Sequence, residues 1–202
     1  MSNLSAGFVV WITGLPASGK TSLAKAVHDL LADERIFTLI LDAGDIRPLL
    51  TPKPEYTDAE RRWFYQAIIG LAAQFARQGA NVIIAATGNR RLYREQARRC
   101  CPVFAEVYLD CALDVCRSRD STGQYNADTD YVPGIGVAYE PPFAPEVIVR
   151  TASKTPAQAA QTVIDILKLE GIIPREACNG NSQPISQHFS QPIGCQQAAP
   201  TV

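Results

Sequence analysis

The sequence predicts an α/β protein whose parallel five-stranded sheet is covered by helices on both faces. Two patterns predict this fold. Short apolar, β-branched runs alternate with amphipathic segments along the chain, and the first run passes through a glycine-rich loop directly into a helical pattern. Buried strands separated by helices are typical of a parallel sheet with both faces covered. The 202 residues suit one domain of ordinary size, which we expect over residues 1–173.

Apolar periodicity places the first two strands and the helix between them. The runs at residues 8–13 and 37–41 are predicted strands. Between them the apolar side chains recur at the spacing of a helix face, which predicts a helix that ends near residues 33–34.

A proline-rich stretch separates the second strand from the next helix. Pro48, Pro52 and Pro54 predict a loop, because proline interrupts regular structure. Thr57 is expected to cap a helix that runs to about residue 78, with Glu60 as its capping-box partner.

The second half of the chain continues the alternation of strands and helices. Residues 120–145 carry no periodic pattern, and loops of that length are usually functional or disordered, so we interpret them as a lid. Residues 174–202 are rich in Gln, Ser and Pro, and we expect a disordered tail there. Further strands are expected at residues 81–86, 103–110 and 146–150, and further helices at 90–99, 113–119 and 156–169.

The glycine-rich loop has the form G-x-x-x-x-G-K-T, between a strand and a helix, which is the phosphate-binding P-loop. Its glycines allow a tight turn in which backbone N–H groups point at phosphate oxygens. We expect Lys20 to reach the β- and γ-phosphates and the Thr21 hydroxyl to bind Mg²⁺. The motif predicts a P-loop NTPase-type fold with ATP and Mg²⁺ as cofactors, bound by Gly14, Leu15, Pro16, Ala17, Ser18, Gly19, Lys20 and Thr21.

Composition and charge argue against several classes of function. The formal net charge is −1 and charged residues make up 19%, so neither nucleic acid nor a membrane surface is an expected partner. No apolar run approaches the roughly 20 residues that cross a bilayer. The six cysteines show neither a C-x-x-C motif nor zinc spacing, and reduced thiols with a cytoplasmic location are expected.

Polar residues follow the predicted strands at their carboxyl ends, where ligands bind in sheets of this kind. Asp45 and Asp42 are the candidate carboxylates that orient an acceptor hydroxyl and take its proton. Arg47, Arg61 and Arg90 are the candidate clamps on an anionic acceptor.

These candidates have structural alternatives. Asp42 could be a turn residue at the strand end, and Arg61 could lie on a solvated helix face. Arg117 and Arg119 at the base of the lid could contact the γ-phosphate or the adenine of ATP, or could form a solvated helix end.

Several stretches resemble adenylylsulfate kinase in their order and spacing. They are the P-loop, residues 41–47 (L-D-A-G-D-I-R), 106–110, 115–125, 133–135 and 139–142. The resemblance covers about residues 7–171. It implies transfer of the γ-phosphoryl group of MgATP to the 3′-hydroxyl of adenylylsulfate, the chemistry of sulfate activation. It also places Gly134 and Ile135 in the acceptor site.

Several departures from the family concern the acceptor, among them Gln66 in place of an Arg and Val132-Pro133 in place of Phe-Thr. Where the family has D-G-D-N-x-R, the second acidic residue here is displaced by one position, to Asp45. Trp63 and Phe64 replace a Glu-Asn pair, and Phe64 is expected to contact the acceptor. Residues 120–145 contain no Lys or Arg, whereas the family lid is basic, so an acidic lid would repel phosphosulfate.

Two other functions therefore stay open. A kinase of the same fold could act on a less anionic nucleoside, sugar or natural-product hydroxyl, which Trp63, Phe64 and the acidic lid would suit. A non-catalytic ATP-binding module would follow if Asp45 could not reach an acceptor. The sequence also leaves open a homodimer.

Overall fold

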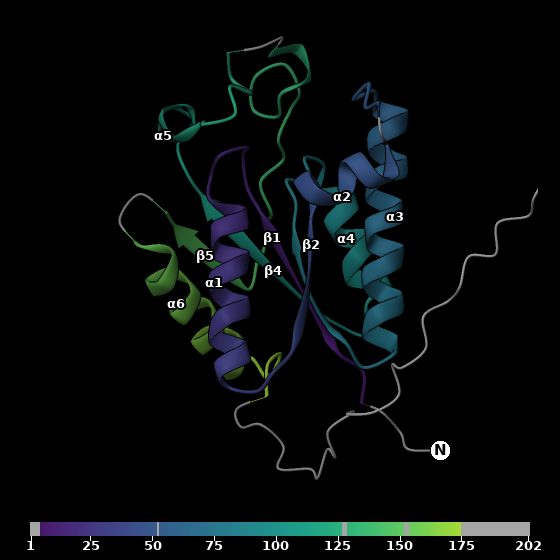
Figure 1. Ribbon diagram of the computed structural model, residues 1–202, viewed down its shortest axis with the longest axis vertical. Helices are drawn as coiled ribbons and strands as arrows, with labels where there is room; N and C mark the ends of the chain where they lie inside the picture. The colour runs from purple at the N-terminus through teal and green to yellow at the C-terminus, as the bar shows by residue number, and fades with distance from the viewer. Residues whose placement is uncertain (1–4, 52, 127–128, 152–153, 175–202) are drawn as a thin grey trace, which may run out of the picture.

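The computed structural model describes residues 5–51, 53–126, 129–151 and 154–174. Within them, five parallel strands in the order β2-β3-β1-β4-β5 form one sheet with helices on both faces (Figure 1), which confirms the predicted fold. The elements are β1 (Phe8–Thr13), α1 (Lys20–Asp33), β2 (Thr38–Asp42), α2 (Ala43–Leu50), α3 (Asp58–Arg77), β3 (Asn81–Ala85), α4 (Arg91–Cys100), β4 (Val103–Asp110), α5 (Leu113–Arg119), β5 (Val147–Arg150) and α6 (Pro156–Leu169).

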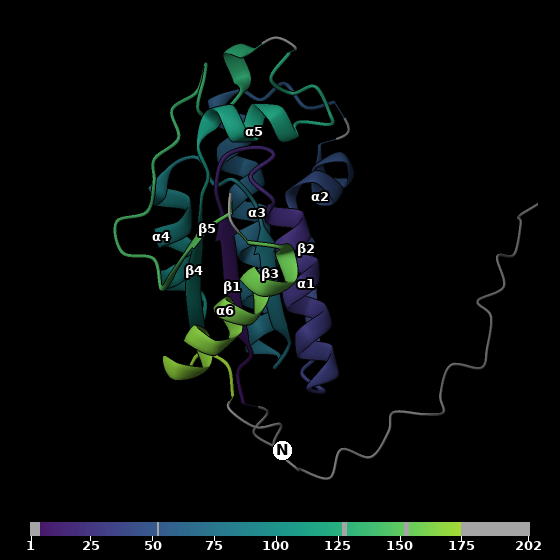
Figure 2. The same cartoon turned by 90° about the vertical axis from the view of Figure 1, so that its left-hand side faces the viewer.

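Strand β1 supplies both hydrophobic cores, because successive side chains of a strand point to opposite faces. Val10 and Ile12 pack in the core with α1 and α6, whereas Val9 and Trp11 pack in the core with α3 and α4. Every residue of β1 is buried. The P-loop at its carboxyl end is therefore built on the buried central strand of the sheet. Figure 2 shows α5 and the lid segment above this end of the strands.

The loop predicted from the prolines is wrong in its first part, because Ala43–Leu50 form helix α2 with Pro48 inside it. Asp42 caps the helix, since its Oδ1 accepts the N–H of Gly44 at 2.8 Å. Pro48 has no N–H to donate, and a proline in a helix interior costs about 3 kcal/mol or more. The Asp42 cap, at about 1 kcal/mol, offsets part of this cost.

The capping box predicted for α3 forms only in part. The Thr57 hydroxyl accepts the N–H of Glu60 at 3.3 Å, as expected. The Glu60 carboxylate does not accept a hydrogen bond from the N–H of Thr57, as a full capping box would require. It binds Arg47 and the N–H groups of Glu55 and Tyr56 instead.

In its described part, the lid, residues 120–145, packs on the P-loop. The Tyr125 hydroxyl donates to the Pro16 carbonyl at 2.9 Å. Gly134 lies so close to Leu15 that a Cβ atom built on it would stand 2.6 Å from Leu15 Cδ2. The described part of the lid contains one short 3₁₀ turn, Thr129–Tyr131.

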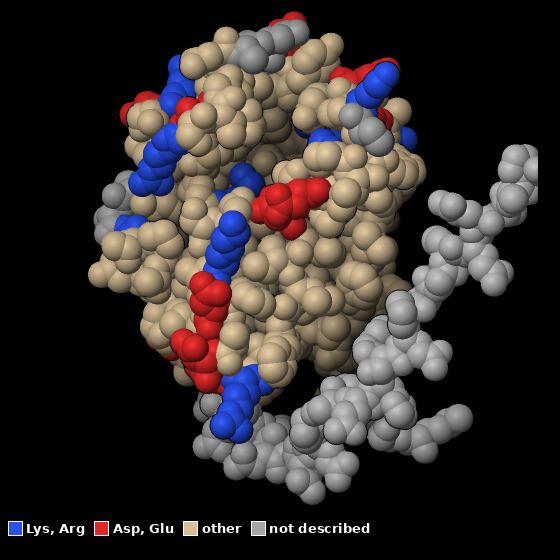
Figure 3. Space-filling model, in the orientation of Figure 1, with Lys and Arg blue, Asp and Glu red and all other residues tan. Residues whose placement is uncertain are grey.

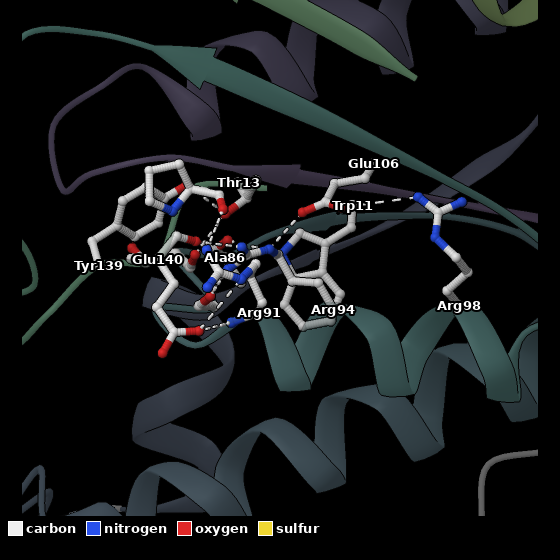
Figure 4. Close-up of polar contacts among 12 residues, drawn as sticks. Trp11, Thr13, Ala86, Arg91, Arg94, Arg98, Glu106, Tyr139 and Glu140 are labelled. Carbon is white, nitrogen blue, oxygen red and sulfur yellow. Dashed lines mark hydrogen bonds and ion pairs between the residues drawn. The ribbon is translucent and has the colours of Figure 1, made fainter. Parts of the chain in front are cut away.

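A buried arginine ties the end of the lid to the sheet (Figure 4). Arg94 donates to Glu106 Oε1 at 2.5 Å, to the Glu140 carbonyl at 2.5 Å and to the Gly88 carbonyl. Beside it, the Asn89 side chain donates to the Ala138 carbonyl at 3.2 Å. The lid is thus anchored at β4 and at the turn between β3 and α4.

Apart from Pro174, the predicted tail lies outside the described residues. Across the part of the chain that the structure describes, no helix combines the length and the apolar character needed to cross a membrane.

Candidate functional site

The P-loop makes the tight turn that its glycines predict. Gly14 and Gly19 have φ angles of 152° and 101°, which favour glycine. At Gly14 there is also no room, because a Cβ atom would stand 2.8 Å from Ser18 Oγ and 3.0 Å from Leu109 Cβ. Ala17 adopts a φ of 56°, a strained backbone conformation of the kind that clusters at ligand sites.

Two polar side chains in the loop fit an anionic ligand. Lys20 Nζ donates to the carbonyls of Gly14 at 3.1 Å and Leu15 at 2.7 Å, and burial lowers the pKa of Lys20 to about 8. Ser18 Oγ is buried and has no hydrogen-bond partner among the described residues. A buried donor without a partner is costly, and a phosphate oxygen would satisfy it. The loop and the amino end of α1 together have the features of an anion site.

The carboxyl end of β2 meets the start of α1 through one short hydrogen bond. The Thr21 hydroxyl donates to Asp42 Oδ2 at 2.6 Å, and Asp42 is buried. Hydroxyl and carboxylate oxygens suit Mg²⁺, which keeps waters and phosphate oxygens as its other ligands. The described residues contain no group of three or more His, Cys, Asp or Glu that could hold a metal ion. The residues present therefore fit a Mg²⁺ ion held jointly with a nucleotide.

Two cavities meet at the P-loop, and Lys20, Thr21 and Gln124 line both. The β5-side cavity, of about 470 Å³, lies along the start of α1. It is also lined by Arg119 and by Thr151, which follows β5. Arg119 donates to the Thr151 carbonyl at 3.0 Å and to its hydroxyl at 3.1 Å, so it joins the base of the lid to this wall.

The α2-side cavity, of about 680 Å³, opens on the other side of Lys20. Figure 3 shows a hollow between the lid and the α2–α3 side, with basic atoms in its depth. Lys20, Arg47 and Arg61 line it, and Asp42 is the acidic residue in its described lining. This wall therefore carries an excess of positive charge.

Both arginines of this cavity are fixed by the protein. Arg47 forms an ion pair with Glu60 at 2.9 Å, and its guanidinium lies 3.7 Å from the centre of the Phe64 ring. Arg61 is 4% exposed and donates to the carbonyls of Tyr56 at 3.0 Å and Tyr131 at 2.6 Å. Burial lowers the pKa of Arg61 from its ordinary value.

Eight of the predicted site residues line neither cavity: Gly14, Leu15, Gly134 and Ile135 belong to the P-loop or to the lid against it, and four others lie apart. Asp45 is exposed on the first turn of α2, and Arg117 is exposed near the end of α5. Arg90 forms an exposed ion pair with Asp58 at 2.6 Å. Phe64 is completely buried beneath the Arg47 guanidinium, so it acts on the cavity through Arg47.

The two predicted lid residues lie against the P-loop. Gly134, with a φ of 93°, contacts Leu15, and Ile135 packs on a small buried cluster that contains Cys116 and Tyr125. The neighbouring residues Val132 and Pro133 line the α2-side cavity.

Sequence reasoning missed the tyrosines of the α2-side cavity, Tyr56, Tyr65 and Tyr131. Tyr56 precedes the capped helix and Tyr131 lies in a segment without periodicity. Only the prediction of a ligand-covering lid could have drawn attention to Tyr131. Tyr65 resembles any core aromatic residue, and its hydroxyl accepts the N–H of Gly88 at 3.0 Å.

Comparison with known proteins agrees with this geometry. Residues 6–150 match the family described as Adenylylsulphate kinase. The adenylyl-sulfate kinase of Geotalea daltonii is 36% identical over 171 residues, which cover 82% of this chain and 84% of the relative. The adenylyl-sulfate kinase of Burkholderia ambifaria is 37% identical over 169 residues, which cover 81% of this chain and 93% of that relative.

A solved structure shows the same relationship. The Mycobacterium tuberculosis APS kinase CysC, in complex with AMPPNP and APS, superposes with a TM-score of 0.75 and 28% identity, over 81% of this chain and 98% of that one. With a family match over most of its length and relatives above 30% identity, this chain belongs to the adenylylsulphate kinase family.

Proposed function

We propose that this protein transfers the γ-phosphoryl group of ATP to the 3′-hydroxyl of adenylylsulfate. The observation that carries the proposal is that two cavities meet at Lys20 and Thr21, one along the P-loop and one with a cationic wall. A donor nucleotide and an anionic acceptor would then lie on either side of the same lysine. A relative solved with AMPPNP and APS supports this pair of ligands.

On the donor side, the P-loop N–H groups, Ser18 and Lys20 would hold the phosphates, and Arg119 lies at the far wall of the cavity. Thr21, whose hydroxyl is oriented by its hydrogen bond to Asp42, would hold Mg²⁺ together with phosphate oxygens and waters, and the ion neutralises charge on the phosphates when bound. ATP supplies the phosphoryl group.

On the acceptor side, Arg47 and Arg61 would bind the phosphosulfate, and Lys20 would neutralise charge on the group in transfer. We assign the carboxylate role to Asp42, because it lines the cavity and Asp45 does not. Asp42 orients the hydroxyl and takes its proton as the new O–P bond forms and the bond to ADP breaks. This placing of reactants accounts for most of the catalysis in phosphoryl transfer.

ATP consumption by the purified protein, with Mg²⁺ and with or without adenylylsulfate, tests the function. We expect strong stimulation by adenylylsulfate. Asp42→Asn should lower kcat by about 10²-fold or more, while the matched variant Asp45→Asn should leave turnover little changed. An equal loss in Asp45→Asn would return the carboxylate role to Asp45.

The same assay decides between the proposed acceptor and less anionic ones. The cationic wall of the α2-side cavity favours an anionic acceptor over a sugar or natural-product hydroxyl. Tight ATP binding without stimulation by adenylylsulfate would contradict the proposal, and a screen of neutral hydroxyl compounds would then be required. A homodimer remains a prediction that light scattering of the purified protein would test.

A further inference from the structure

Glu60 holds one wall of the α2-side cavity together without lining the cavity itself. Its Oε1 accepts from Arg47 at 2.9 Å. Its Oε2 accepts the backbone N–H groups of Glu55 at 2.5 Å and Tyr56 at 2.8 Å. The Glu60 side chain is only 14% exposed. A single carboxylate thus joins helix α2, the loop that precedes α3, and α3.

Tyr56 is the residue on which these contacts converge. Its φ angle is 55°, in the left-handed region that side-chain-bearing residues rarely adopt. Its carbonyl accepts from Arg61 Nε at 3.0 Å, and its ring centre lies 5.1 Å from the guanidinium carbon of Arg47 and 5.5 Å from that of Arg61. Strained residues persist where the surroundings over-determine them, and they cluster at ligand sites.

Glu60 contacts Arg47 and Tyr56 directly, and Arg61 is joined to them through the Tyr56 carbonyl. Arg47, Tyr56 and Arg61 line the α2-side cavity, and the Arg47 guanidinium is held between the Phe64 ring and Glu60. Without the carboxylate, Arg47 could turn toward solvent, and the strained Tyr56 backbone could relax away from the cavity. Both changes would have to be reversed before an acceptor binds, at a cost in affinity.

We infer that Glu60 is a positioning residue for the acceptor: its carboxylate fixes Arg47 and Tyr56 so that the cationic, aromatic wall exists before the acceptor arrives. The inference rests on the proposed function, since it takes the α2-side cavity as the acceptor site. It assigns Glu60 no contact with either substrate.

Glu60→Gln is the test variant, because it keeps the shape of the side chain. A carboxamide has one acceptor oxygen and one donor group, so it cannot accept from both Arg47 and the two N–H groups. We expect the KM for adenylylsulfate to rise about tenfold or more, the usual effect of losing a hydrogen bond to a charged group. The KM for ATP should change little, because the P-loop is untouched.

Glu95→Gln is the matched control, since it removes the same charge from an exposed ion pair, with Arg99 at 3.7 Å. It should leave both KM values unchanged. A purely structural role for Glu60 would lower the melting temperature and the amount of active protein with both KM values kept. That result, or an unchanged KM for adenylylsulfate, overturns the inference.

Hydrogen exchange of the Glu55 and Tyr56 amides, measured by NMR without any acceptor, gives a second readout. Both amides should exchange slowly in the native protein and much faster in Glu60→Gln. Unchanged exchange overturns the inference whatever the kinetics show. Absence of turnover by the native protein would refute the proposed function, and the exchange result would still decide whether Glu60 fixes the wall.

Discussion

The ion pair between Arg94 and Glu106 allows a quantitative test of how the lid is anchored. The Arg94 side chain is 1% exposed, lies 2.5 Å from Glu106, and also donates to the carbonyls of Gly88 and Glu140. Removal of Arg94 leaves the buried Glu106 carboxylate with only the more distant Arg98, at 3.9 Å, and loss of one partner of a buried pair costs about 3–5 kcal/mol. We expect this loss of unfolding free energy in Arg94→Met. At about 2–4 °C per kcal/mol for a domain of this size, the melting temperature should fall by about 6–20 °C.

Urea unfolding followed by circular dichroism measures this free energy. Arg99→Met is the matched control, since Arg99 forms an exposed pair with Glu95, and it should cost less than about 1 kcal/mol. The double variant Arg94→Met/Glu106→Leu removes both buried charges and should be more stable than Arg94→Met by about 1–3 kcal/mol. The reasoning is refuted if Arg94→Met costs no more than Arg99→Met, or if the double variant is no more stable than the single one.

Two further predictions concern the P-loop and the lid. Burial lowers the pKa of Lys20 to about 8, so the protein without nucleotide loses this ammonium charge above that pH. Because phosphates bind the charged form, the ATP dissociation constant should rise about tenfold per pH unit above 8. In Lys20→Arg the dissociation constant should not change with pH over this range. Calorimetric titration of ATP measures both, and a native dissociation constant that does not change with pH contradicts the prediction. Gly134→Ala combines a φ of 93° with a contact of 2.6 Å to Leu15, and we expect about 1–2 kcal/mol against the closed lid, or a rise of about 5–30-fold in both KM values. Gly123→Ala is its control, since φ is 72° there but no atom lies within 4 Å of the added Cβ, and an equal effect of the two variants would exclude a role for the Leu15 contact.

The strands and most helices could be predicted from sequence because each depends on a local pattern. The buried residues of β1 and the Thr57 cap of α3 are examples of such signals. Helix α2 was missed because Pro48 suggests a loop, while the stabilising contact is the Asp42 cap at the Gly44 N–H. A cap and a proline within one short segment act in opposite directions, and periodicity does not say which prevails.

The P-loop half of the candidate site can be predicted from the sequence, whereas the α2-side half cannot. The P-loop is contiguous, so its turn and the place of Lys20 follow from spacing alone. The α2-side cavity depends on contacts between distant segments, such as that of Arg61 with the Tyr131 carbonyl. Sequence alone also favours Asp45 as the site carboxylate, because the turn of helix α2 is not visible in the sequence. In the structure that turn leaves Asp45 exposed, whereas Asp42 lines the cavity.

The charge of the acceptor site also depends on segments that are distant in the sequence. The absence of Lys and Arg from residues 120–145 predicts repulsion of phosphosulfate, but the lid carboxylates Asp120 and Glu140 do not line the α2-side cavity. Asp120 accepts the N–H groups of Tyr125 and Thr122, bonds that lower its pKa, and Glu140 accepts the N–H of Arg91. The cations of the cavity come from α2 and α3, as Arg47 and Arg61.

The charge that an acceptor meets is therefore set by the wall beneath the lid more than by the lid. Within a cavity, a charge a few ångströms from the ligand outweighs one of opposite sign that faces solvent, because solvent screens the latter. The basic α2–α3 wall can neutralise an anionic acceptor without help from the lid, so a lid without Lys or Arg is compatible with membership of this family.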